Sequence, residues 1–325
     1  MKKSNFNWQF KEVSPIDPIF KAELMNQGYT ETFAELLWNR NIHTLEDFSQ
    51  LLKTTIDDLH DPFLMHDMDK AVERIQTAVM EGQAILVYGD YDADGITSTS
   101  IMLETLQMIG ADVHYVLPNR FIHGYGPNKE LFAEKINEGI QLIITVDNGV
   151  AGNEAIDFAN SQNVDVIVTD HHELPPILPA AYCIVHPRHP EGHYPFGELA
   201  GAGVAFKLAT ALLEEVPLEM LDLVTIGTVA DLVSMTGENR VLVKLGLQAI
   251  KQTQRLGLLE LLKVSGVALQ KADETSIGFS IGPRLNAIGR LGDPNPAVEL
   301  MTTFDAARAH VLAEKLAQSN NQRKQ

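Results

Sequence analysis

The chain has 325 residues, 45% of them hydrophobic and 21% charged, which is typical of a soluble globular protein of about two domains. Its 25 Lys+Arg against 43 Asp+Glu give a net charge of −18. That charge argues against a broad basic face for nucleic acid, so a phosphate ligand would need a local Arg/Lys cluster or metal ions. The single cysteine, Cys183, excludes a disulfide framework and a Cys-rich zinc site. The first 15 residues lack the apolar core of a signal peptide, and no run of 18 apolar residues occurs, so we expect a cytoplasmic protein with no membrane partner.

The first 82 residues show a short helical pattern. Apolar residues recur at three-to-four spacing in 33–37 and 68–79, and Asp61-Pro62 separates the two stretches. No convincing strand occurs there. The pattern predicts a helical N-terminal region over residues 1–80.

A different rhythm begins at Ala84. Short apolar runs rich in Val and Ile alternate with helix-compatible stretches; the runs are 84–89, 113–118, 142–147, 164–170 and 182–187. Continuous apolar strands separated by helices indicate a mainly parallel sheet covered by helices on both faces, an α/β fold whose polar sites gather at the carboxyl ends of the strands.

The chain after His186 is predicted to be helical. Four helices are expected, over 199–215, 219–234, 239–252 and 255–264, and helix formers continue from Ala297 to Ala317. We interpret residues 297–325 as the start of a long helix that connects to a second domain absent from this sequence.

Acidic residues and histidines concentrate where the strands end. The first strand runs into Gly-Asp-Tyr-Asp-Ala-Asp-Gly (89–95), the third ends in Asp147 and the fourth in Asp170-His171-His172. In a parallel sheet these ends are neighbours, so five aspartates and two histidines should converge. Carboxylates so close repel one another unless protons or cations neutralise them. Oxygen ligands with one or two imidazoles suit Mn²⁺ or Mg²⁺, and two such ions can polarise a phosphoryl group and lower the pKa of a bridging water.

Each of these residues also has an ordinary structural interpretation. A lone Asp at a strand end is usually a helix N-cap, which Asp94 before Gly95 could be. An isolated His-His pair is more often a surface or core feature than a ligand. Three separate strand ends that carry such residues together favour the metal site, because buried acids without partners are costly.

The motifs YGDYDADG, TVDNG and TDHH, in this order and spacing, resemble motifs I to III of the DHH phosphoesterase superfamily. Within it the chain is most similar to the RecJ single-strand-specific exonucleases. The likeness extends through 61–75, 117–128, 199–208, 228–240 and 282–291, and so covers nearly the whole chain.

The resemblance implies the roles of the site residues. The metal-ligand positions correspond to Asp92, Asp94, Asp147, His171 and Asp231; these residues together with His172, which would face the scissile phosphate, form the implied catalytic set. Asp170 would orient a histidine. Some DHH enzymes carry a metal-binding His where this chain has Tyr88, so either Asp90 helps to bind that metal or the site is weaker. Two ions, Mn²⁺ or Mg²⁺, are the implied cofactors.

A phosphate clamp requires positive charge only where the strand would pass. The candidates are Arg120, His123, Arg188, His189, Arg284, Asn286 and Arg290. Gly124, Gly126 and Gly289 would let the backbone approach a phosphate closely, and the planar fork of Arg matches phosphate oxygens. His172 is also expected to contact the substrate. For any single Arg the alternative is a solvated surface charge.

The implied function is metal-dependent 5′→3′ hydrolysis of single-stranded DNA to nucleoside 5′-monophosphates, in DNA repair and recombination. The alternatives are a DHH phosphodiesterase acting on short oligonucleotides or cyclic dinucleotides, and a catalytically silent module that binds a partner. The expected organisation is a helical region over 1–80, a DHH catalytic domain over 81–296 and a connecting helix over 297–325. The expected partners are single-stranded DNA and a single-strand-binding protein or helicase, with the chain itself a monomer.

Overall fold

The computed structural model describes residues 14–324. Residues 1–13, most of the segment assessed above for signal-peptide features, lie outside the described residues. The chain divides after Thr55 into two compact units. Residues 56–80, which the sequence analysis groups with the N-terminal region, fall in the larger unit. The domain boundaries at 80/81 and 296/297 remain predictions.

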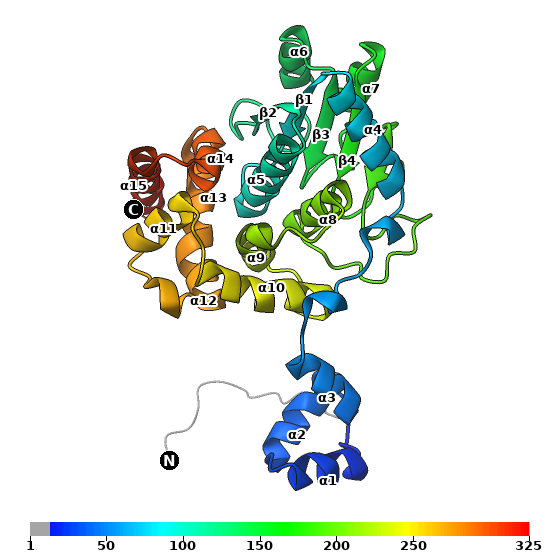
Figure 1. The fold of residues 1–325 in the computed structure, drawn as a ribbon, viewed down its shortest axis with the longest axis vertical. Coiled ribbons are helices and arrows are strands. Elements are labelled where there is room, and N and C mark those ends of the chain that lie inside the picture. Colours follow the sequence, from blue (N-terminus) through cyan, green and yellow to red (C-terminus); the bar gives the residue numbers. More distant parts are fainter. Residues whose placement is uncertain (1–13, 325) are drawn as a thin grey trace, which may run out of the picture. The chain divides into compact units, whose positions relative to one another are not determined.

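The smaller unit contains three short helices, α1 (Pro18–Asn26), α2 (Glu31–Trp38) and α3 (Leu45–Leu52), drawn in blue in Figure 1. Side-chain oxygens cap each of them: Asp17, Thr30 and Thr44 accept hydrogen bonds from the first turns. The buried core is Phe20, Leu24, Ala34, Leu37 and Phe48.

The larger unit is built on a parallel sheet, which confirms the predicted fold class. The five strands are β1 (Ala84–Tyr88), β2 (Asp112–Val116), β3 (Leu142–Val146), β4 (Asp165–Thr169) and β5 (Cys183–Val185), each within two residues of its predicted bounds. Their order is β2-β1-β3-β4-β5, and every pair is parallel. Tyr88 pairs with Thr145, and Val146 pairs with Thr169. The ends of β1, β3 and β4 therefore lie at one edge of the sheet.

Helices cover both faces of this sheet (Figure 1). α4 (Met68–Met80), α5 (Ala93–Met108) and α8 (Gly201–Leu213) pack on one face in the larger core, and α6 (Lys129–Asn137) and α7 (Asn153–Ser161) pack on the other. The short helical turns η1 (Ile56–Asp58) and η2 (Pro62–Leu64) precede α4.

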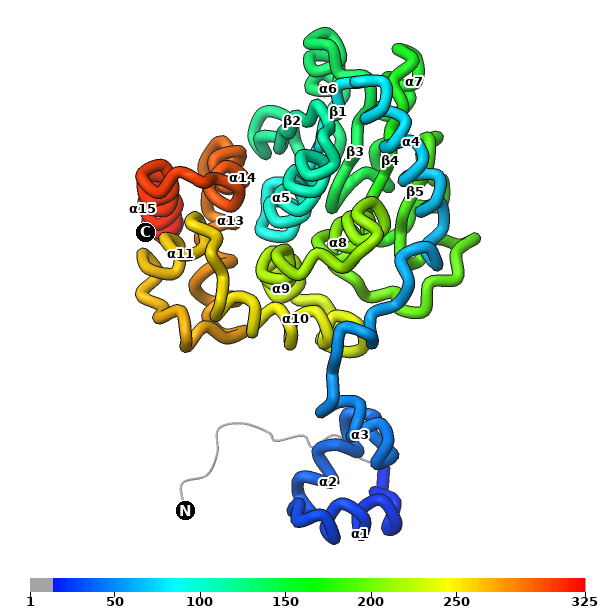
Figure 2. The backbone as a smooth tube through the Cα atoms, viewed as in Figure 1, coloured from blue at the N-terminus to red at the C-terminus, as the bar shows by residue number. Residues whose placement is uncertain are grey.

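The remaining helices extend the first of these faces. After η3 (Leu218–Met220), α9 (Leu221–Ala230) packs on α5 and α8, as the backbone trace in Figure 2 shows. The chain continues through α10 (Gly237–Ile250), α11 (Leu256–Val264), η4 (Leu269–Lys271), α12 (Glu274–Ser276), the π-helical turn η5 (Ile277–Ile281), α13 (Gly282–Leu291), α14 (Asn295–Thr302) and α15 (Ala306–Arg323). No helix within residues 14–324 is long and apolar enough to cross a membrane.

Two helix ends differ from the prediction for local reasons. The helix predicted over 219–234 ends at Ala230. Leu232 has a left-handed φ of 63°, which is incompatible with a right-handed helix. The helix formers from Ala297 do not form one helix: α14 stops at Thr302, and Asp305 caps α15 by accepting from the N–H groups of Ala307 and Arg308.

A buried ion pair ties four segments of the larger unit together. Lys207 of α8 pairs with Glu238 of α10, and each is 1% exposed. The Lys207 ammonium also donates to the His60 carbonyl at 2.6 Å, and Glu238 accepts from His60 N–H at 2.9 Å and from the Tyr194 hydroxyl at 2.5 Å. Both charged groups of this cluster therefore have hydrogen-bond partners in addition to each other, as a buried charge requires.

Lys207→Met should lower the free energy of unfolding by about 3–5 kcal/mol, because it leaves the Glu238 carboxylate buried without its cation. The matched control is Lys263→Met, which removes an exposed i,i+3 pair with Glu260 and should cost under about 0.5 kcal/mol. Urea unfolding of both variants measures the difference. Equal losses would contradict the assignment of the cluster as a strong internal tie.

Candidate metal centre

The carboxyl ends of β1, β3 and β4 bring the predicted acids and histidines together. Asp90, Asp94 and Asp147 are at most 2% exposed, and His171 is 9% exposed. The ligand atoms form three overlapping groups, each within 4.8 Å: Asp94, His171 and Asp231; Asp147, His171 and His172; Asp90, Asp92 and Asp147. The convergence expected from the sheet topology is thus present, and Asp231 joins it from the end of α9.

The N-terminus of α8 holds the Asp94 carboxylate. Oδ2 accepts from Gly201 N–H at 2.7 Å and Oδ1 accepts from Ala202 N–H at 2.9 Å. Free amides at the first turn of a helix favour an anion. The close approach requires glycine, because a Cβ at position 201 would lie 2.4 Å from Asp147 Oδ1, and one at position 227 would lie 2.5 Å from Asp94 Oδ1.

Two buried polar atoms in this centre have no hydrogen-bond partner. They are Asp147 Oδ1 and His171 Nε2. The two atoms lie 3.1 Å apart, and Nε2 also lies 3.7 Å from Asp94 Oδ2 and from Asp231 Oδ2. Unsatisfied buried atoms are costly unless something else binds them. Three carboxylates and one imidazole aimed at a common point are a donor set that fits Mn²⁺ or Mg²⁺.

The electrostatics of the centre point the same way. Burial first, and neighbouring carboxylates second, raise the pKa of Asp90 to about 7 and of Asp231 to about 6, and raise the pKa values of Asp94 and Asp147 well above the ordinary range. Burial lowers the pKa of His171 to about 4, so its imidazole is neutral at pH 7 and has a free lone pair. A cation would relieve the repulsion that protons otherwise neutralise.

His172 is held differently from His171. Its Nδ1 donates to Asp170 Oδ1 at 2.7 Å, and its Nε2 forms a 3.0 Å hydrogen bond with the Tyr125 hydroxyl. The bond to Asp170 raises the pKa of His172 to about 9. Asp170 also accepts from the backbone N–H groups of Val150, His171 and His172. Burial raises the pKa of Asp170, but the hydrogen bond and charge of the His172 ring, followed by the Val150 and His172 amides, outweigh burial and lower it. Asp170 is therefore a charged anchor that orients the His172 ring.

Two features of the first motif differ from the simplest expectation. Asp92, rather than Asp94, is the N-cap of α5: its Oδ1 accepts from the N–H groups of Asp94 and Gly95, both at 3.0 Å. Tyr88 points away from the centre, packs edge-on against Phe132 and donates its hydroxyl to the Gly126 carbonyl at 2.9 Å. Asp90, and not Tyr88, contributes a possible ligand here: one of its oxygens lies within 4.8 Å of oxygens of Asp92 and Asp147.

The predicted phosphate contacts divide into two classes. The Arg120 guanidinium lies over the Tyr91 ring, 5.7 Å from its centroid. Burial raises the pKa of the Tyr91 phenol, and the charges of Arg120 and Arg290 partly oppose that rise. Both arginines therefore lie close to the first motif. The others are engaged within the chain. Asn286 Oδ1 accepts from Ala93 N–H at 2.6 Å, His123 Nδ1 accepts from Asn119 N–H, Arg284 donates to the Ser280 carbonyl, and Arg188 donates to the His171 carbonyl at 2.6 Å. His189 belongs to a separate cluster.

Several positioning residues were not singled out from the sequence. They are Tyr125, His186, which bonds the His172 carbonyl through Nε2 at 2.9 Å, and the amides of Gly201 and Ala202. The His171–His172 side of the centre opens on a cavity of about 210 Å³ that Arg188 and Glu198 also line. The glycines of the segment 199–208 were the one sequence feature that could have indicated the contact between α8 and Asp94. The contact itself is made by backbone N–H groups, which every residue except proline carries, so residue types do not predict it.

Comparison with known proteins identifies the family. A model described as the DHH family, N-terminal domain, matches residues 84–228. The chain is similar to a solved structure of exonuclease RecJ bound to manganese, with 38% identity and a TM-score of 0.73 over 80% of this chain and 67% of that one. This chain belongs to the RecJ group of the DHH family.

Other members of this group show the same likeness. The single-stranded-DNA-specific exonuclease RecJ of Bacillus subtilis is 46% identical over 323 residues, 99% of this chain and 41% of that protein. The structure of Thermus thermophilus RecJ in complex with Mg²⁺ matches 95% of this chain and 42% of that one, with 32% identity and a TM-score of 0.71. The chain thus spans less than half the length of the curated RecJ relative from B. subtilis.

Gly201→Ala should weaken Mn²⁺ binding by about a hundredfold, because the new Cβ would push the Asp147 carboxyl away from its place. The control is Gly203→Ala in the same helix, where the atoms nearest to a new Cβ belong to the Leu199 side chain, from 3.1 Å, and not to a predicted ligand. Calorimetric titration of the metal-free proteins with Mn²⁺ gives both affinities. Similar affinities for the two variants would show that the approach of α8 to Asp147 does not shape the centre.

The metal-free chain should lose stability as the pH rises. Between the unfolded carboxyl pKa of about 4 and the folded values of about 6 for Asp231 and about 7 for Asp90, the folded state binds more protons than the unfolded state. The lowered pKa of His171 acts in the opposite direction between about 4 and 6.5, but four carboxyls have raised pKa values. We therefore expect the free energy of unfolding to fall with pH over this interval. Thermal melts in chelator should show a Tm that falls as the pH rises across this interval. Mn²⁺ should remove most of this pH dependence, and Asp147→Asn should make the fall in Tm shallower. A chelated parent whose Tm rises over the same interval would contradict the assignment.

Proposed function

We propose that this chain is a metal-dependent exonuclease that hydrolyses single-stranded DNA in the 5′→3′ direction to nucleoside 5′-monophosphates, in DNA repair and recombination. The observation that carries the proposal is the pair of partnerless buried atoms, Asp147 Oδ1 and His171 Nε2, inside a ring of carboxylates. The RecJ relatives, named as single-stranded-DNA-specific exonucleases, support the substrate and the reaction.

Two groups of side chains would hold the metal ions. Asp94, His171 and Asp231 form one, Asp90 and Asp92 contribute to the other, and Asp147 lies between the two groups. RecJ relatives were solved with manganese and with Mg²⁺, and we propose these ions here. When bound, they supply Lewis-acid polarisation of the phosphoryl group and lower the pKa of a coordinated water.

His172 is proposed to contact the phosphate that reacts. With a pKa near 9 it is an imidazolium at pH 7, and its Nδ1 proton is committed to Asp170. The Nε2 proton, which the Tyr125 hydroxyl accepts in this structure, is the one that a phosphate oxygen would take. A fixed donor aimed at developing negative charge stabilises a transition state more than a mobile one.

Arg120 and Arg290 are proposed to bind the DNA backbone beside the reacting phosphate. They are exposed and lie close to Tyr91, next to the first motif. Arg284 is half-buried and donates through one terminal nitrogen to the Ser280 carbonyl, and its other terminal nitrogen is proposed to bind a phosphate. His123 and Asn286 are proposed to act mainly by shaping their loops, since each already accepts a backbone N–H group.

The partners and location are proposed more simply. Single-stranded DNA is the proposed ligand, and a single-strand-binding protein or helicase is the proposed protein partner of the monomer. The cytoplasmic location remains a prediction from the sequence.

Digestion of end-labelled DNA tests the function. With Mn²⁺, a 5′-labelled single strand should release labelled mononucleotide first, whereas a 3′-labelled strand should shorten stepwise, and a blunt duplex should resist. EDTA should abolish the reaction. Asp147→Ala should lower the rate by about a thousandfold, since loss of a shared ligand removes several kcal/mol of transition-state stabilisation.

The matched control is Asp157→Ala, an exposed acid on α7, which should keep the parental rate. Cleavage of dinucleotides with no cleavage of long strands would instead support the oligonucleotide phosphodiesterase alternative. Full Mn²⁺ binding without hydrolysis of any of these substrates would support the silent module.

A further inference from the structure

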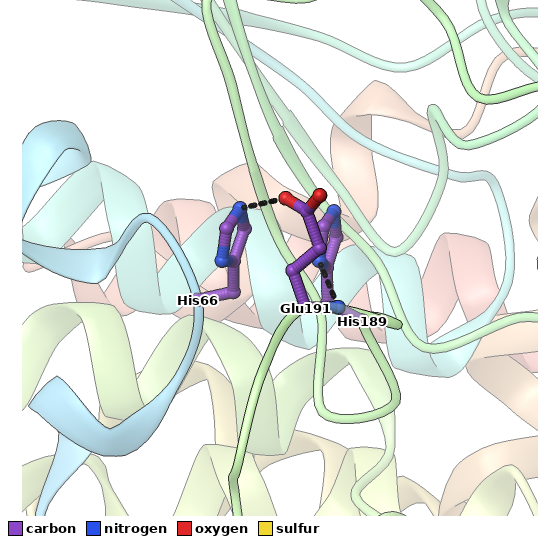
Figure 3. A group of neighbouring side chains, drawn as sticks. All are labelled: His66, His189 and Glu191. Atoms are coloured by element: carbon purple, nitrogen blue, oxygen red, sulfur yellow. Dashed lines mark hydrogen bonds and ion pairs between the residues drawn. The ribbon is translucent and has the colours of Figure 1, made fainter.

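A second cluster of possible ligands lies outside the strand-end centre. His66, just before α4, and His189 and Glu191, in the segment after β5, bring one ligand atom each to within 4.8 Å of the others. Figure 3 shows the two imidazole rings face to face, with the Glu191 carboxylate at one end of both. None of these residues belongs to the three ligand groups at the strand ends.

The contacts in this cluster are close but weak. The rings stack with centroids 3.9 Å apart and planes 6° from parallel. His66 Nε2 lies 3.7 Å from Glu191 Oε2 and 3.5 Å from Asp67 Oδ1. These distances exceed those of hydrogen bonds. The two histidines thus face carboxylates that attract a cation, and no strong internal bond has to be broken to admit one.

The donor set suits a transition metal. Two imidazoles and a carboxylate, with a water in the fourth position, are a common ligand set for tetrahedral Zn²⁺. Imidazole ligands disfavour Mg²⁺ and Ca²⁺, which take oxygen.

From this geometry we infer that His66, His189 and Glu191 form a Zn²⁺-binding site separate from the strand-end centre. His66 would bind through Nε2, which already lies 3.7 Å from Glu191 Oε2. His189 would bind through Nε2 as well, although its Nδ1 accepts the Glu191 N–H at 3.2 Å in this structure. Binding places the proton of the neutral His189 ring on Nδ1, which gives up that long hydrogen bond. The rings also tilt out of the parallel stack, because a ring nitrogen binds a metal in its own ring plane. Glu191, whose side chain is 76% exposed, is free to follow.

The site joins two segments that are distant in the sequence. A Cβ at Gly192 would lie 3.3 Å from the His66 Cβ, so the segment after β5 already packs against His66, two residues before α4. The same segment carries His186 and Arg188, which bond the carbonyls of His172 and His171. Zn²⁺ bound to His189 and Glu191 would therefore stabilise the chain that holds the two strand-end histidines in place. The inference does not depend on the nuclease function.

Metal analysis of the whole chain tests the site without DNA. In an Asp94→Asn/Asp147→Asn background, which disables the strand-end centre, the chelator-treated protein should regain about one Zn²⁺ per chain after gel filtration. Adding His66→Ala and His189→Ala should remove that equivalent. Co²⁺ in place of Zn²⁺ should give the visible absorption of a tetrahedral site in the first protein and not in the second.

Two further variants keep the test decisive. Glu191→Gln changes an exposed side chain and should weaken Zn²⁺ binding by about tenfold with the fold unchanged by circular dichroism. His193→Ala removes an exposed imidazole of the same segment that lies outside the cluster, and should leave binding unchanged. Equal Zn²⁺ content with and without His66 and His189, or equal affinity in Glu191→Gln and the parent, would overturn the inference.

Discussion

Like-charge repulsion at one edge of the sheet is the constraint on which the rest of the larger unit depends. Asp90, Asp94, Asp147 and Asp170 are all nearly inaccessible to solvent, so water cannot screen them and either protons or cations must neutralise most of their charge. The α8 N-terminus supplies part of that compensation through the amides of Gly201 and Ala202. The parallel order of the strands, the glycine at position 201 and the approach of α9 together bring the acids and their compensation to one place.

Two aspartates in equivalent places show how surroundings decide function. Asp147 and Asp170 each follow a buried strand, yet Asp170 accepts four hydrogen bonds from Val150, His171 and His172 and its pKa is lowered. Asp147 keeps an oxygen without any donor and its pKa is raised. The first is satisfied by protein alone and works as a support. The second is stable as an anion only when a cation is added, which is the property expected of a metal ligand.

The sequence predicts what depends on periodicity and strand ends, and little of what depends on backbone atoms. Five strands and the convergence of Asp94, Asp147 and His171 follow from apolar runs and parallel topology, because register brings successive strand ends to one edge. The resemblance, rather than periodicity, indicated Asp231. The amide clamp on Asp94 and the Tyr125–His172 bond could not be foreseen, since they require the path of distant segments. The sequence analysis considered Asp94 as the N-cap, whereas the cap is Asp92, two residues earlier. N-cap propensity cannot distinguish two aspartates so close together.

The placement of positive charge shows how so acidic a chain could bind the polyanion proposed as its substrate. Of the cations near the centre, Arg188 is used to bind the His171 carbonyl, whereas Arg120 and Arg290 stay exposed beside Tyr91. Side chains can therefore neutralise only a few DNA phosphates. Because the salt dependence of binding scales with the number of neutralised phosphates, it should reflect contacts with a short stretch of the DNA backbone. The remaining positive charge must be carried by ions at the strand ends. If the proposed function holds, affinity for DNA and occupancy by metal are coupled through the same buried carboxylates, because each cation that relieves their repulsion also presents a charge to the phosphate.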